Sequence, residues 1–312
     1  MKKNKTFKTS IGGQAVLEGV MMKGPDKMAV AVRKSDGEIV IDQKEVSSIT
    51  KKYKFLKLPV IRGVVNFVES MVLGIKTLMF SADLYDGGED DPAYKPSKLD
   101  MWLEEHLSKD AVVYFSLVLA LGLSVLLFVF LPAFITKAVT FFIESHILKS
   151  LIEGAVRMVI FVLYIFLASL AKDIRRVFEY HGAEHKTIFC YEKGEDLTVE
   201  NVKKQSRLHP RCGTSFLIEV MIVSILAFSV ISWDSLLVRI GLKLLMLPLI
   251  AGVTYEFLKF SGRSNSKCIA LLIKLGLWLQ KITTREPDDK QIEVAIASMK
   301  EVIPENKEDA KW

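Results

Sequence analysis

The chain has 312 residues, half of them hydrophobic, and a formal net charge of +6 at neutral pH. Its positive mean hydropathy is unusual for a soluble protein and places the chain among membrane proteins. The sequence has no basic stretch interleaved with aromatic residues, which would favour nucleic-acid binding. The positive charge is therefore expected to face anionic lipid. No apolar segment follows the N-terminal lysines, so no cleavable signal peptide is expected.

The first 57 residues are predicted to form a β-rich segment before any membrane helix. Two runs, Met28 to Arg33 and Glu38 to Asp42, flank Ser35-Asp36-Gly37, and a turn of this kind between apolar runs is typical of a β-hairpin. A further apolar run, Gln14 to Met22, is bounded by glycines. These patterns predict a small antiparallel sheet.

Residues 58–82 have the pattern of an amphipathic helix. Arg62, Asn66, Glu69 and Lys76 recur near the helical period among Val, Phe, Met and Leu residues. The helix is expected to lie along the membrane surface or to pack its polar face against the polar loop at 172–215. Residues 83–110 begin with an acidic, glycine- and proline-containing stretch and are predicted to be a linker.

Four apolar stretches are long enough to cross a bilayer, which takes about 20 helical residues. They form two predicted hairpins, 111–171 and 216–259, and the individual spans are residues 111–131, 155–171, 216–233 and 236–259. Arg239 and Lys243 lie near the start of the fourth span, and such long cations can reach the membrane interface. The chain is therefore predicted to be an α-helical integral membrane protein with about four transmembrane helices and a small N-terminal antiparallel β segment.

Lysine and arginine are distributed unevenly among the loops. The segment 172–215 carries nine of them, whereas the loop between the first two spans carries only Lys137 and Lys149. The positive-inside rule therefore predicts that both termini and the 172–215 loop lie in the cytoplasm.

The most informative motif is His181-Gly182-Ala183-Glu184-His185, which has the pattern H-x-x-E-H. On a helix, its first, fourth and fifth positions lie on one face. His181 and His185 could then hold one divalent ion while Glu184 takes a proton from the attacking water, as in the inverted zinc-protease motif. The motif predicts a zinc site in the 172–215 region, with Glu184 as general base.

A second group, His209-Pro210-Arg211-Cys212, adds an imidazole and a thiol at a spacing suited to a metal-binding turn. His209 and Cys212 are therefore predicted as further ligands. Short motifs also occur by chance, and the alternative is a hydrogen-bonded polar cluster that holds no ion. The coincidence of both spacings favours the metal.

The chain has three cysteines, Cys190, Cys212 and Cys268. Their odd number and their spacing are not those of a disulfide-rich protein, so a disulfide scaffold is not expected. Cys212 is predicted to be a thiolate ligand or a reduced thiol. Cys190 and Cys268 are expected to be small buried apolar groups.

Charged residues in apolar or motif segments are accessory candidates for the site. Glu219 enters the third span and Glu256 leaves the fourth, both at the predicted cytoplasmic level. A salt bridge or an interfacial position is the alternative for each, and at least one is expected to join the site. The accessory candidates are Glu18, Glu69, Glu179, Arg211, Glu219 and Glu256.

Residues 260–312 are predicted to form cytoplasmic helices and a tail. Pro287 with Asp288 and Asp289 is typical of the first turn of a helix. An apolar face at helical spacing follows, and it is expected to pack on the cytoplasmic domain: Ile292, Ala295, Ile296, Met299 and Val302. Residues 305–312 are expected to be a frayed tail.

Four segments, 12–22, 179–187, 209–216 and 283–287, resemble the hallmark sequences of the YqhQ-like family of bacterial integral membrane proteins. They occur in order over nearly the whole chain. The resemblance implies a metal-dependent enzyme of the bacterial inner membrane, but it does not supply a reaction or a substrate.

Two classes of function remain. The first is a zinc-dependent hydrolase at the cytoplasmic face that acts on a lipid-linked or membrane-peptide substrate, with lipid and this unknown substrate as its partners. The second is a non-catalytic membrane protein whose structural zinc serves assembly or transport. The number of protein ligands discriminates them, because four would close the site and three would leave it open. Glu184 favours the enzyme, and the sequence leaves a homo-oligomer open.

Overall fold

The computed structural model describes residues 7–46, 48–85, 101–102, 106, 108–229, 236–261 and 266–311. The chain divides into two compact units. The first comprises residues 1–86, 165–220 and 248–312, and the second comprises residues 87–164 and 221–247. The predicted linker at 83–110 falls largely outside the described residues.

The first unit begins with a four-stranded antiparallel sheet in the order β1-β2-β3-β4, which confirms the predicted sheet. The strands are β1 (Gly12–Val16), β2 (Gly19–Lys23), β3 (Lys27–Arg33) and β4 (Ile39–Glu45). The predicted hairpin turn lies between β3 and β4, where Gly37 has φ +90°.

The apolar run Gln14 to Met22 contributes two strands to the sheet, most of β1 and most of β2. The chain reverses at Leu17-Glu18, where Glu18 has φ +47°. The carbonyl of Glu18 accepts a hydrogen bond from Arg33 N at 2.8 Å, which ties the turn to the next strand but one. A tight turn without glycine at its centre gives no sequence signal of the usual kind.

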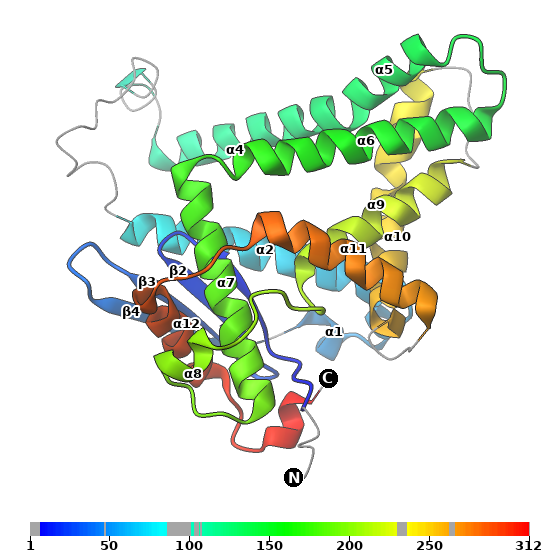
Figure 1. Ribbon diagram of the computed structural model, residues 1–312. Coiled ribbons are helices and arrows are strands. Elements are labelled where there is room, and N and C mark those ends of the chain that lie inside the picture. The colour runs from blue at the N-terminus through cyan, green and yellow to red at the C-terminus, as the bar shows by residue number, and fades with distance from the viewer. Residues whose placement is uncertain are drawn as a thin grey trace. The chain divides into compact units, whose positions relative to one another are not determined.

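The sheet is covered on both faces, as the period-2 alternation of its apolar side chains requires. On one face lie α7 (Lys172–Lys193) and α12 (Asp289–Val302), which Figure 1 shows against the strands. The strand residues of this core are Val20, Met22, Ala29 and Ala31. On the other face α2 (Ile61–Leu84) contributes Leu73, Phe80 and Leu84, which pack against Val16, Met21, Met28, Val30 and Val32.

The remaining elements of the first unit are short or apolar. They are α1 (Ile49–Lys52), η1 (Lys54–Lys57), α8 (Val199–Lys203), α11 (Lys267–Thr283), η3 (Lys307–Ala310), the start of α9 (Gly213–Ser229) and the end of α10 (Leu236–Ser261). Asp288 caps α12 with a capping box, as its acidic start predicted.

The predicted frayed tail is wrong. Thr9 forms a β-bridge with Lys311, and Ser10 N donates to Ala310 O at 2.7 Å. Ala310 is fully buried in the core. The tail is held by main-chain pairing with a distant segment, which its own polar composition does not reveal.

Within the described chain, four helices are long and apolar enough to cross a membrane: residues 61–84, 114–139, 146–168 and 241–260. The last three overlap the predicted first, second and fourth spans. The predicted third span corresponds to α9, a shorter apolar helix of 17 residues, and its end at 230–233 lies outside the described residues. The predicted amphipathic helix, α2, joins the long apolar helices.

The second unit contains α4 (Lys109–Val125), the π-helical turn η2 (Leu126–Phe130), α5 (Leu131–Val139) and most of α6 (His146–Ala168). Glu153 accepts from Arg157 at 2.8 Å and pairs with Lys243 of α10. Lys243 is therefore buried in an ion cluster.

Candidate metal centre

The helix α7 presents the H-x-x-E-H motif. His181 lies one helical turn before Glu184 and His185, and these last two side chains are buried. Cys212 approaches from the residue just before α9. One nitrogen of each imidazole and the Cys212 sulfur lie within 4.8 Å of one another, and His181 Nε2 is 3.1 Å from the sulfur. Three donors of metal-ligand type therefore converge from two segments.

A backbone carbonyl anchors each imidazole through its Nδ1 atom. Thr283 O lies 2.8 Å from His181 Nδ1, and Arg207 O lies 2.6 Å from His185 Nδ1. A carbonyl accepts, so each Nδ1 is the donor and each Nε2 is the nitrogen that faces Cys212 or the buried space beside it. The Nε2 atom of His185 is buried and has no hydrogen-bond partner among the described residues. Metal-binding histidines are typically anchored in this way through the other ring nitrogen.

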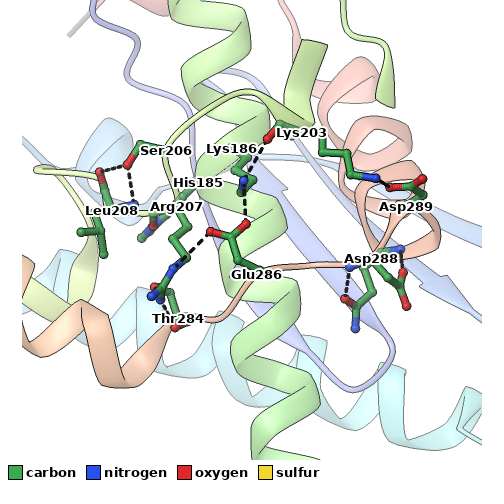
Figure 2. Close-up of polar contacts among 11 residues, drawn as sticks. His185, Lys186, Lys203, Ser206, Arg207, Leu208, Thr284, Glu286, Asp288 and Asp289 are labelled. Atoms are coloured by element: carbon green, nitrogen blue, oxygen red, sulfur yellow. Dashed lines mark hydrogen bonds and ion pairs between the residues drawn. The ribbon is translucent and has the colours of Figure 1, made fainter. Parts of the chain in front are cut away.

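Charged side chains in turn hold these carbonyl-bearing segments against α7, as Figure 2 shows. The buried Lys186 amino group donates to Lys203 O at 3.0 Å and pairs with Glu286 at 2.8 Å. Arg207 pairs with the same carboxylate at 3.4 Å and donates to Thr284 Oγ1 at 2.9 Å. The loop before Cys212 and the segment after α11 are thereby fixed to the helix that carries the motif.

Cys212 has the surroundings of a thiolate. Burial alone would raise the pKa of its thiol, but His185 and hydrogen bonds from Thr214 outweigh burial and lower the pKa below its ordinary value. Thr214 N lies 3.4 Å from the sulfur in the first turn of α9. A lowered thiol pKa favours the form that binds metal.

Glu184 faces a small cavity of about 90 Å³ that His185 and Cys212 also line. Burial raises the pKa of Glu184 to about 8, although the nearby His181 and the N–H of Gly13 oppose the shift. A Cβ atom on Gly13 would lie 2.9 Å from the Glu184 carboxyl carbon, so only glycine lets β1 approach so closely. The carboxyl group is thus enclosed but borders the space beside the donors.

His209 lies apart from the three donors. Its ring is 5.6 Å from that of His185, and its Nε2 is 3.6 Å from a Glu192 oxygen. Burial opposes the charge of Glu192, but His209, the Thr9 N–H and Arg211 outweigh it, so the pKa of this carboxyl is lowered. His209 and Arg211 also line the small cavity. The structure therefore places the predicted ligand on the cavity wall.

Four of the five accessory acids have partners away from the three donors. Glu18 pairs with Arg176 and accepts from Tyr180 at 3.1 Å, and Glu256 pairs with Arg62. Glu69 accepts from Ile49 N at 2.8 Å, and Glu179 accepts from Gln291 at 3.0 Å. Glu219 is buried on α9, and its Oε2 has no hydrogen-bond partner among the described residues.

Sequence reasoning did not single out Glu192, Gly13 or the carbonyls of Thr283 and Arg207. Glu192 had a signal, because it follows His185 by seven residues and so shares its helix face. The carbonyls had none of their own, since any residue type supplies one.

The donor set fits a zinc ion. Two imidazole nitrogens and one thiolate are ligands that zinc prefers. The sites that use three protein ligands are those that keep a position open for water or substrate. A carboxyl group and a small polar cavity beside the donors agree with that kind of site.

Comparison with known proteins finds a matching family and a similar relative. The family model described as "Protein of unknown function (DUF1385)" matches residues 58–305. The chain is 35% identical over 295 residues to "Uncharacterized protein YqhQ" of Bacillus subtilis (strain 168), with 94% of this chain and 92% of the relative covered. No solved structure matches the chain.

Proposed function

We propose that this chain, which belongs to the YqhQ-like DUF1385 family, is a membrane-embedded zinc-dependent hydrolase that acts at the cytoplasmic face on a lipid-linked or membrane-peptide substrate. One observation carries the proposal: three donors, His181, His185 and Cys212, converge beside a cavity that also holds a carboxyl group. Three protein ligands with an open side are typical of catalytic zinc, whereas structural sites take four.

The residues divide the work as follows. His181, His185 and Cys212 would hold the ion, which when bound polarises a carbonyl or phosphoryl oxygen and makes water more acidic. Glu184 holds the proton taken from the attacking water, since its carboxyl lines the same cavity. His209, whose Nε2 lies 3.6 Å from a Glu192 oxygen, also lines this cavity, and its ring can contact a substrate there.

The alternative is a structural zinc that staples the loop at 207–212 to α7. The small volume of the cavity, about 90 Å³, favours this reading, because it admits a few water molecules and no large group. The two functions differ at Glu184, which only the hydrolase uses as a base.

Glu184→Gln tests the hydrolase. The variant keeps size and fold but removes the base, so it should retain about one zinc per chain while function in a deletion strain falls severely. General bases typically contribute about 10²–10⁴-fold in rate. Elemental analysis of purified protein gives the metal content, and complementation gives the function.

Two controls bracket this variant. His181→Ala should lose the zinc, since two remaining donors bind too weakly, whereas His146→Ala, at an exposed position on α6, should change neither readout. A Glu184→Gln protein that binds zinc and complements fully would contradict catalysis through this residue.

A further inference from the structure

A larger cavity lies beside the small polar one. It is a groove of about 560 Å³, within the range of ligand-binding pockets. Its walls come from α2, α9, α10 and β1. Its lining includes Gln14, Phe67, Met71, Gly213, Phe216 and Leu258. Most of the lining is apolar, so the groove suits a hydrocarbon more than a polar ligand.

The groove and the small cavity at the candidate metal centre share a lining residue. Gly213 lines both the groove and the small cavity. Gln14 lines the groove and Gly13 lines the cavity, so the two spaces lie on opposite faces of β1, which is an edge strand of the sheet. A molecule with its apolar part in the groove can therefore reach its polar end toward Glu184 and the three donors. The two cavities together match an amphiphile.

The groove also lies where apolar helices begin and end. Phe216 is in the first turn of α9, which starts at Gly213, and Leu258 is in the last turn of α10, which ends at Ser261. In a membrane protein these helix ends lie at the interface between lipid and water, where lipid headgroups lie.

The position of α2 follows from the shared core. The sheet, α7 and α12 pack together, so all three lie on one side of a membrane, and the chain between them crosses an even number of times. The helix α4–α5 with α6 supplies one pair of crossings, and α9 with α10 supplies the other. The helix α2 is left on the membrane surface, with one face on the sheet and an exposed apolar face that includes Val68 and Val72.

We propose that this groove binds the hydrocarbon chain of a lipid substrate and places the polar linkage of that lipid in the small cavity, an inference that rests on the proposed function. A peptide is the less favourable occupant, because each residue brings a backbone donor and acceptor that need partners. The groove offers four polar side chains for that purpose, those of Gln14, Asn66, Ser70 and Tyr255. A hydrocarbon chain requires none.

Photolabelling of the full chain tests the proposal. The protein is reconstituted in vesicles of phosphatidylethanolamine and phosphatidylglycerol that carry a phospholipid with a diazirine in its acyl chain, and adducts are located by mass spectrometry. Adducts on groove residues such as Phe216 and Leu258 are expected. Met71→Trp fills the groove and should reduce these adducts about tenfold, the loss expected when about two buried methylene groups are displaced.

Val72→Trp is the matched control. Met71 and Val72 are neighbours on α2 and are 51% and 47% exposed, but only Met71 lines the groove. Equal adduct yields in the two tryptophan variants would overturn the proposal. So would an apolar peptide bearing a diazirine that labels Phe216 and Leu258 and displaces the lipid.

The metal centre is scored separately. His181→Ala should leave groove labelling unchanged, and Met71→Trp should leave zinc content unchanged, because neither substitution touches the other site. If the wild-type protein is labelled in the groove but carries no zinc as purified, the lipid site stands and the zinc-dependent hydrolase is contradicted. If the protein binds zinc but Met71→Trp does not lower the yield of lipid adducts, only the lipid site is contradicted.

Discussion

Glu184 shows how one residue can be costly to the fold and useful to the site. Its carboxyl is fully enclosed, and one of its oxygens has no hydrogen-bond partner in the described part of the chain. Burial in such a position costs less free energy for a protonated carboxyl group, or for a carboxylate beside a cation, than for an isolated carboxylate. A nearby divalent ion would favour the charged form that a general base needs.

At the residue scale, the raised pKa of Glu184 predicts a pH-dependent stability. The folded value is about 8 and the ordinary value is 4.5, so the native state holds the proton more tightly than the unfolded state. Well below pH 4.5 the carboxyl group therefore does not change the free energy of unfolding. As the pH rises toward 8 it lowers that free energy progressively, by about 5 kcal/mol at most.

The measurement compares chelated wild type with Glu184→Gln. The wild-type unfolding temperature should fall relative to that of the variant between about pH 5 and about pH 8. The paired comparison cancels the titration of other groups. A difference that stays constant with pH would show that Glu184 is not enclosed as described.

At the element scale, α7 depends on the segment that follows α11. Arg285 N donates to Phe178 O at 2.8 Å, and Thr283 O orients His181. A Cβ atom on Gly182 would lie 2.0 Å from Arg285 O. Glycine at the second position of the motif therefore lets this segment reach the helix and hold the first histidine.

Gly182→Ala should consequently weaken the site without removing a ligand. Displacement of the segment is expected to cost about 1–3 kcal/mol and to reduce zinc affinity about 10- to 100-fold through the lost anchor of His181. Thermal unfolding and competition with a zinc chelator measure the two effects. Gly122→Ala, where the added methyl meets open space, is the control and should be neutral or stabilising.

At the scale of the whole molecule, the shared core constrains the membrane topology. We therefore predict that the segment 172–212 lies on the same side of the membrane as the sheet and that the loop between α5 and α6 lies on the other side. The lysine and arginine asymmetry assigns the first side to the cytoplasm. We predict from this that the candidate metal centre faces the cytoplasm.

Cysteine labelling in intact cells checks this orientation. An impermeant maleimide should label Glu144→Cys, at an exposed position between α5 and α6, above the parent background. Glu200→Cys, at an exposed position on α8, should be labelled only after permeabilisation. External labelling of Glu200→Cys would reverse the orientation and move the chemistry to the opposite side.

The features that the sequence predicted correctly depend on local pattern. Period-2 runs around Ser35-Asp36-Gly37 predicted the hairpin, and the acidic start at Asp288 predicted α12. Helical spacing alone brought His181 and His185 together on α7. Such features require only neighbours within a few residues, and neighbours are what a sequence displays.

Only the tertiary structure decided which distant groups meet. It placed Cys212, but not His209, with the two histidines, because the loop at 207–212 is fixed by Arg207 and Glu286. It also brought the carbonyl of Thr283 to His181, and paired the tail at Lys311 with Thr9. These contacts join segments separated by roughly 30 to 300 residues, and packing of both faces of the sheet, which no local period encodes, determines their positions.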